Sequence, residues 1–270
     1  MGVALRAIAR DTLGEVLPRL GPGDLSLLDD EALADMAAPP PGMLVPLLGD
    51  EAMILATYAD LARSREPLRE LWDGTGKPSQ VDPGWGMIPE AGYRVLFYRD
   101  EVAAVREAMH RFEHLAVTFQ GSPGRGIFWR EAATHFEASP RLNRPVVRLL
   151  TPGFAAIGNA HLRSEALASA TRVAIAATRM RLVTGAWPVT CADLVPRFLG
   201  SVPLDPYAAE GTMKITPIDG GIVIFSVGPD GEDNGGPPER GDFSIDPGQD
   251  DVGLWVAPRG TAAHPPATDE

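Results

Sequence analysis

The chain has 270 residues, of which 44% are hydrophobic, and it carries a formal net charge of −12. A chain of this length can bury a core of ordinary size and can form two domains. The negative charge disfavours nucleic acids and anionic membrane surfaces as partners. The single cysteine, Cys191, excludes an intramolecular disulfide and a cysteine-rich zinc cluster.

The N-terminal part of the sequence is typical of helices interrupted by Pro and Gly. Acidic residues open a predicted helix at 29–37, and residues 49–72 predict two helices. A loop rich in Gly and Pro follows over 72–92. Residues 93–120 predict a long amphipathic helix, because apolar residues recur there every three or four positions. We therefore expect an all-helical domain over residues 1–158.

A different organisation begins near Asn159. Residues 161–184 predict a helix with a narrow seam of small and apolar residues, ended by Gly185 as a C-terminal cap. The seam consists of Ala166, Ala170, Val173, Ala177 and Met180. A seam of small side chains allows another element to approach the helix closely.

Strand signals follow this helix. Two β-branched runs, 213–218 and 221–227, flank an Asp-Gly-Gly turn and predict a hairpin, and 251–256 predicts a further strand. We expect these strands to form a small antiparallel sheet on which the seam packs. The sequence thus predicts an α+β domain over residues 159–258, followed by a disordered tail over 259–270.

The negative charge is concentrated in one segment. Residues 205–251 contain eight Asp and three Glu against Lys214 and Arg240, so they hold most of the excess charge. The densest part, "FSVGPDGEDNGG" (225–236), contains oxygen ligands at Asp230, Glu232 and Asn234, which are positions 1, 3 and 5 of an EF-hand loop. Position 12 is a glycine and a strand precedes the loop, so the segment is not an EF-hand.

Two interpretations of this segment stay open. A calcium site completed from Asp242, Asp246, Asp250 or Asp251 would offset the repulsion among neighbouring carboxylates. A solvated acidic turn is the alternative, since Asp, Asn and Gly commonly gather in turns. The candidate metal ligands are Asp230, Glu232, Asn234, Asp250 and Asp251.

One motif points to enzyme chemistry. The segment "HRFEH" (110–114) matches the H-x-x-E-H pattern of zinc peptidases, in which two histidines one helical turn apart hold zinc and the glutamate activates water. A third ligand, such as Glu165, would have to come from elsewhere in the chain. The alternative is a polar helix face with two exposed histidines. A zinc-dependent hydrolase using His110, Glu113 and His114 is therefore an alternative function.

The order of short motifs over residues 162–256 resembles the C-terminal region of the major pseudopilins of type II secretion. The resemblance rests on a turn after the long helix, an Asp-Pro-aromatic turn, a Gly- and Asp-rich loop after a strand, and an acidic pair before the last strand. These residues are Gly185, Trp187 and Pro188; Asp205, Pro206 and Tyr207; Gly228, Asp230, Gly231, Gly235 and Gly236; and Asp250, Asp251 and Val252. The resemblance implies a helix packed on a small sheet, and calcium bound in the loop.

The whole chain also looks similar to bacterial envelope proteins that combine a helical N-terminal half with such an end. This resemblance implies a non-enzymatic structural or protein-interaction role at a bacterial cell envelope or periplasm, with a protein partner or self-association. The apolar stem of pseudopilins has no counterpart here, so assembly into a fibre is not implied. No apolar run approaches the roughly 18 residues of a membrane helix, and no targeting signal is visible. A cytoplasmic helical binding module is the third reading.

Overall fold

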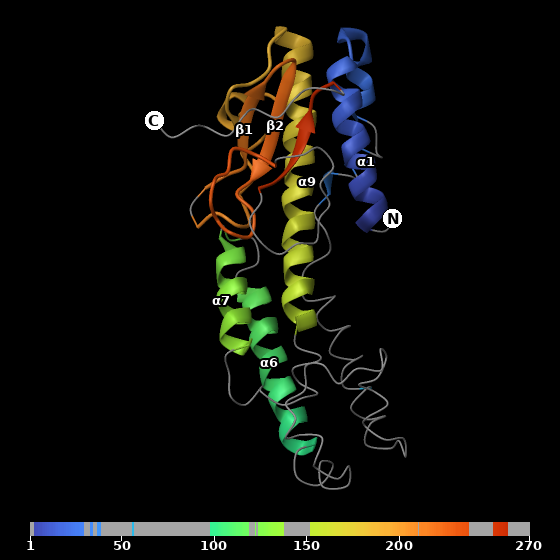
Figure 1. The fold of residues 1–270 in the computed structure, drawn as a ribbon. Coiled ribbons are helices and arrows are strands. Elements are labelled where there is room, and N and C mark those ends of the chain that lie inside the picture. The colour runs from blue at the N-terminus through green and yellow to red at the C-terminus, as the bar shows by residue number, and fades with distance from the viewer. Residues whose placement is uncertain are drawn as a thin grey trace. The chain divides into compact units, whose positions relative to one another are not determined.

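The computed structural model describes residues 3–29, 33–34, 37–38, 56, 98–118, 122, 124–137, 152–209, 211–237 and 251–258. The chain is α+β, as the sequence predicts, and it combines helices with one small antiparallel sheet (Figure 1). By contacts, it divides into two compact units. The first contains Met1–Pro41, Phe119–Phe128 and Asn159–Glu270, and the second contains Gly42–Thr118 and Trp129–Gly158. The second unit ends at Gly158, where the sequence suggests a boundary. Residues 1–41 and 119–128, however, belong to the first unit together with the C-terminal part of the chain.

The described helices follow one another in chain order. They are α1 (Val3–Val16), the 3-10 helices η1 (Leu17–Arg19) and η2 (Pro22–Asp29), α6 (Tyr98–Thr118), α7 (Arg125–Glu137), α9 (Pro152–Thr184) and the 3-10 helix η5 (Cys191–Leu194). The strands are β1 (Lys214–Ile218), β2 (Gly221–Ser226) and β3 (Val252–Val256). None of these helices is long and apolar enough to cross a membrane. The predicted helices and loop over 49–92 and the tail over 259–270 lie outside the described residues, apart from helical Ala56.

The three strands form a sheet in the order β1-β2-β3, with both pairs antiparallel. The strands agree with the predicted runs to within one residue. β2 is buried along its whole length, because its two sets of alternating side chains both meet apolar partners. Ile222 and Ile224 join a core cluster with Leu254 of β3, and Val223 and Phe225 form a second cluster with Trp255. We call the face bearing Val223, Phe225 and Trp255 the outer face.

The inner face of the sheet packs on α9. Ala170, Val173 and Ala177 belong to the same core cluster as Ile222 and Ile224, and all of these side chains are fully buried. This confirms that the central part of the small-residue seam meets the sheet. The ribbon of α9 runs along the strands in Figure 1. Gly185 ends the helix as predicted, with a φ of 80° and its amide donating to the carbonyl of Arg181 at 2.8 Å.

Helix α1 also packs against this sheet. Leu13 and Leu17 lie in the cluster that contains Leu254 and Val256 of β3. Gly14 stands so close to β3 that a Cβ there would be 2.1 Å from the carbonyl oxygen of Trp255. Sequence periodicity identifies an apolar helix face but not the element that it meets, and the expected all-helical domain did not include this packing.

The long helix begins earlier than predicted. α9 starts at Pro152, before the start predicted at residue 161, so Gly158 lies inside it. Residue 158 is a glycine for a steric reason, since a Cβ there would stand 1.8 Å from Cε2 of Trp129. The glycine is therefore explained by the tryptophan packed on the helix and not by a helix end.

The second unit contains the predicted amphipathic stripe of α6. Val105, Met109 and Phe112 are buried, as expected from their spacing. Phe112 packs on Trp129 of α7, with ring centroids 4.7 Å apart and an angle of 43° between the rings. Such tilted aromatic pairs are favourable beyond the area that they bury.

The seam gives a first prediction. Ala170→Glu should unfold the first unit, because it places an unpaired charge in a fully buried position, at a cost of more than about 4 kcal/mol. Ala160→Glu is the matched control, since Ala160 lies exposed on the same helix. Circular dichroism melts should show a large loss for the first variant and almost none for the second. Equal melting of both variants would contradict the packing described here.

Candidate functional site

The acidic segment forms a loop directly after β2, and its first residues are held by a buried carboxylate. We call residues 228–237 the acidic loop. Asp205 accepts hydrogen bonds from the hydroxyl of Ser226 (2.6 Å) and the amide of Val227 (3.0 Å). Since both donors lie at the end of β2, the point where the loop leaves the sheet is fixed.

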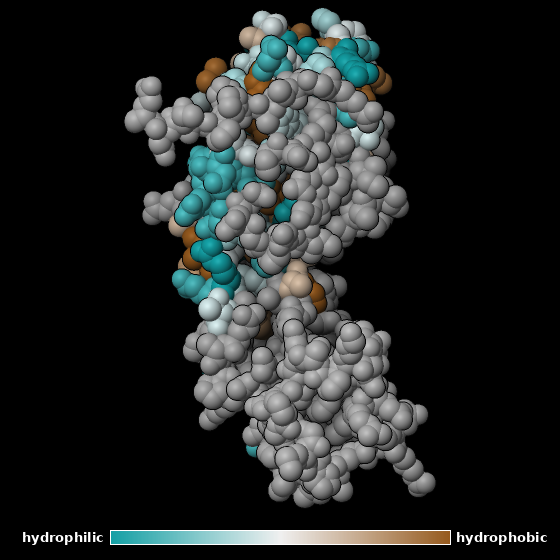
Figure 2. All heavy atoms as spheres, viewed as in Figure 1, coloured by the Kyte–Doolittle hydropathy of each residue, from teal (hydrophilic) through white to brown (hydrophobic). Residues whose placement is uncertain are grey.

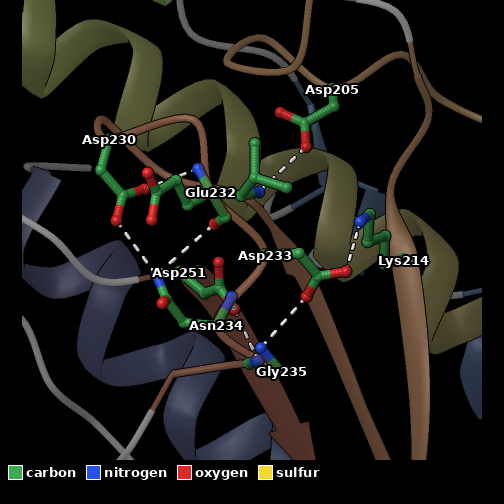
Figure 3. A network of polar contacts seen from close by, with 10 residues as sticks. Asp205, Lys214, Asp230, Glu232, Asp233, Asn234, Gly235 and Asp251 are labelled. Atoms are coloured by element: carbon green, nitrogen blue, oxygen red, sulfur yellow. Dashed lines mark hydrogen bonds and ion pairs between the residues drawn. The ribbon is translucent and has the colours of Figure 1, made fainter. Parts of the chain in front are cut away.

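The loop is folded by its own polar side chains (Figure 3). Asp230 accepts a hydrogen bond from the amide of Glu232 at 3.0 Å and another from the side-chain amide of Asn234 at 3.0 Å. Asp233 accepts from the amide of Gly235 at 3.1 Å. These are the local side-chain contacts by which Asp and Asn stabilise turns. On the face drawn in Figure 2, hydrophilic residues gather in patches at the top and along the left side of the described surface, with hydrophobic residues beside them.

Asp251 is the residue at which the loop meets the sheet. It immediately precedes β3, and its side chain lies inside the turn of the acidic loop (Figure 3). Its Oδ2 atom accepts from the amides of Asn234 (3.1 Å) and Gly236 (2.6 Å). The residue is only 2% exposed. Its Oδ1 atom is buried and has no hydrogen-bond partner among the residues that the structure describes.

The surroundings of Asp251 oppose its ionisation. Burial is the main cause that raises the pKa of this carboxyl, and the charges of Asp233 and Asp230 act in the same direction. The Gly236 and Asn234 amides lower it, and the net pKa is about 6. A carboxyl group held in this way is stabilised by a bound proton or requires a nearby positive charge. That requirement distinguishes Asp251 from a carboxylate in an ordinary solvated turn.

Lys214 supplies part of the positive charge near the loop. Its ammonium group pairs with Oδ2 of Asp233. Burial opposes ionisation of Asp233, but the hydrogen bonds from Lys214 and from the amide of Gly235 lower the pKa of this carboxyl below its usual value. Asp233 is thus satisfied by a cation from β1, whereas Oδ1 of Asp251 is not. The EF-hand-like spacing in the sequence pointed to Glu232 and Asn234 as ligands. It did not identify Asp233, which binds Lys214 and the amide of Gly235.

The structure brings together part of the predicted ligand set. Asp230, Asn234 and Asp251 are joined through the hydrogen bonds of one turn, and Glu232 is tied to that turn by its backbone. In the described ranges, no three His, Cys, Asp or Glu side chains converge as a preformed metal cluster. Asp250, Asp242 and Asp246 lie outside the described residues. The unsatisfied Oδ1 of Asp251 is the observation that fits a cation, and Asn234 and main-chain carbonyls are further oxygen donors of the kind that calcium binds.

The histidine motif makes different contacts. In α6, Nδ1 of His110 lies 3.3 Å from the carboxylate of Glu113, and Nδ1 of His114 lies 3.2 Å from the hydroxyl of Thr118. The side chain of His110 is 76% exposed. Glu165, the suggested third ligand, pairs with Arg125. These are the contacts of a polar helix face.

The chain matches no protein-family model, and no curated protein or solved structure shows significant similarity to it.

The histidine contacts give a second prediction. Replacing both His110 and His114 by Ala should change the melting temperature little, because contacts of exposed side chains contribute little to stability. Metal analysis of the purified protein should find no stoichiometric zinc. Zinc bound at one per chain that disappears in the double variant would instead support the hydrolase alternative.

The pKa of Asp251 gives a third prediction. A carboxyl whose pKa is higher in the folded than in the unfolded state binds its proton more tightly when folded, so the contribution of Asp251 to folding stability falls as pH rises from about 4 through about 6. At about 1.4 kcal/mol per pH unit, the loss approaches roughly 3 kcal/mol. Asp251→Asn should remove this loss, so in chelator the variant should gain stability relative to the parent over that range.

The measurement is urea unfolding at several pH values. Asp219→Asn, in the exposed turn between β1 and β2, is the control for removing one negative charge from the same sheet. A stability difference between Asp251→Asn and the parent that does not vary with pH would show that this carboxyl is not held out of its usual range.

Proposed function

We propose that the chain is a non-enzymatic structural or protein-interaction component of a bacterial cell envelope, with a calcium ion that stabilises the acidic loop. The observation that carries the calcium site is the buried Oδ1 atom of Asp251, which has no hydrogen-bond partner within the described part of the chain and lies near the charges of Asp230 and Asp233. The envelope location and the pseudopilin-like character rest on the resemblance of the C-terminal motifs.

Charge balance favours a cation over a solvated turn. A buried carboxylate is costly unless it is paired, and both amide donors to Asp251 bind the same oxygen, Oδ2. A cation at Oδ1 would complete the coordination of this carboxylate and reduce its repulsion with Asp230. The proposed ligands are Asp230, Glu232, Asn234, Asp250 and Asp251.

The chemistry of the loop favours calcium over other divalent ions. All proposed ligands are oxygen donors, which suits hard cations. Calcium accepts six to eight oxygens in flexible geometry, while magnesium requires a tighter octahedral shell. A loop with Gly228, Gly231, Gly235 and Gly236 at positive φ bends easily around a large ion but holds a strict octahedron poorly.

The positions of the pseudopilin-like motifs support a structural role. Gly185 caps α9, Arg181 lies over the ring of Trp187 at 4.8 Å, and Asp205 fixes the end of β2. Each of these residues stabilises a junction between elements. We propose that such a domain presents a surface to a protein partner or to a second copy of the chain.

The calcium proposal gives the fourth prediction. If the folded protein binds calcium and the unfolded chain does not, stability rises by about 2.7 kcal/mol at a free concentration of one hundred times Kd. The melting temperature should therefore increase in calcium and much less in magnesium. Asp251→Asn should abolish the response, and Asp219→Asn should keep it. Asp230→Ala is a poorer test, because it also removes the contacts of Asp230 with Glu232 and Asn234.

Calorimetric melts in millimolar calcium and in chelator decide the matter. Identical curves for the parent protein under the two conditions would leave the acidic loop as a solvated turn.

A further inference from the structure

The acidic loop lies directly on the outer face of the sheet. The side chains of this face are almost fully buried, with Val223 at 3%, Phe225 at 2% and Trp255 at 6% exposure. A Cβ on Gly236 would stand 3.1 Å from Val223 and 3.5 Å from Phe225. The indole nitrogen of Trp255 donates to the carbonyl of Pro237 at 3.2 Å. Gly236 and Pro237 therefore cover part of this apolar surface.

One carboxylate connects this cover with the proposed cation site. Oδ2 of Asp251 binds the amides of Asn234 and Gly236, and so it holds the segment that lies on the outer face. Oδ1 of the same carboxylate is buried and has no hydrogen-bond partner in the described ranges of the chain. Asp251 also precedes β3, the strand that carries Trp255. Whatever binds Oδ1 therefore acts on the group that fastens Gly236.

From this shared carboxylate we infer that the acidic loop is a cover over the outer face of the sheet, and that binding of a divalent cation closes it. The inference rests on the proposed calcium site and adds what that site regulates. It makes exposure of the apolar surface around Val223, Phe225 and Trp255 depend on the free cation concentration.

The direction of the effect follows from two competing costs. In the closed arrangement without a cation, one oxygen of Asp251 is buried and receives no hydrogen bond from the residues that the structure describes, which is unfavourable. Lifting residues 234–237 would let water reach that oxygen, but it would also expose Trp255 and its neighbours. A cation at Oδ1 removes the first cost and leaves the second, so the bound protein favours the closed arrangement.

Hydrogen exchange measures this opening in the parent protein. The amides of Asn234 and Gly236 exchange only when they leave Oδ2 of Asp251. At a free calcium concentration of one hundred times Kd, opening and therefore exchange of these two amides should slow about a hundredfold relative to chelator. Magnesium at the same concentration should slow exchange far less.

Exposure of the outer face is measured separately at Trp255. The chain contains five tryptophans, so the protein is labelled with 5-fluorotryptophan and the Trp255 signal is identified by its absence in Trp255→Phe. Broadening of that fluorine signal by a soluble nitroxide reports contact with solvent. It should be severalfold stronger in chelator than in calcium.

Two glycine variants test the cover without touching a carboxylate. Gly236→Ala places a methyl group against Val223 at a φ of 109°, so it should keep Trp255 accessible to the nitroxide even in calcium. Gly235→Ala is the matched control, because its φ is also positive, at 87°, but nothing lies within 4 Å of its Cβ. The control should close in calcium as the parent does.

The outcomes separate the two proposals. If calcium raises the melting temperature but leaves both Trp255 broadening and Gly236 exchange unchanged, the cover is wrong and the calcium site stands. If calcium changes neither stability nor exchange, both are wrong. A Gly236→Ala protein that closes over Trp255 in calcium like Gly235→Ala would also overturn the cover.

Discussion

The buried carboxylate of Asp205 is the contact on which the C-terminal architecture depends. This fully buried side chain accepts from the amide of Tyr207 (2.8 Å), the hydroxyl of Ser226 and the amide of Val227, so both oxygens are satisfied. Hydrogen bonds to a charged group contribute about 1.5–3 kcal/mol each, and an unmade one at a buried position costs a similar amount. Around this carboxylate, the carbonyl of Pro206 accepts from the amide of Gly126 at the start of α7, and the hydroxyl of Tyr207 donates to the carbonyl of Asn159 in α9. Residues 205–207 thus join the end of β2 to two helices.

Asp251 differs from Asp205 in how many of its oxygens accept hydrogen bonds. Both carboxylates are buried beside the sheet, but among the described residues only Asp205 has donors on both oxygens. A fully satisfied buried group is explained by structure alone, whereas an unsatisfied one requires a further reason, such as a bound ion. The contrast also separates Asp251 from Asp233, which has Lys214 as its counter-charge. The density of acidic residues in the sequence could not make this distinction, because all three aspartates contribute equally to it.

The sequence predicts what depends on local pattern and misses what depends on distant contacts. Period-three and period-four spacing located α6 and the seam of α9, and the β-branched runs located the strands to within a residue. Gly185 could be recognised as a cap because a glycine after a helical pattern has few other roles. Gly158 could not be placed inside α9, since the reason for that glycine is Trp129, far away in the sequence. The spacing of Asp230 and Asn234 in the sequence places both residues in one turn of the acidic loop. The inward position of Asp251, in contrast, depends on where β3 pairs.

Helix α1 and the segment after it are held by contacts with β3 and α9. α1 lies against β3 through Gly14, and two arginines of α9 hold the segment after it: Arg181 donates to the carbonyls of Leu17 and Leu20, and Arg179 to that of Leu28. β3 therefore has α1 on one side, β2 on another, and the acidic loop bound through Asp251 and Trp255. Because β3 is a short edge strand, its pairing with β2 depends on these additional contacts. If the proposed ion binds Asp251, it would stabilise β3 and, through β3, the position of α1.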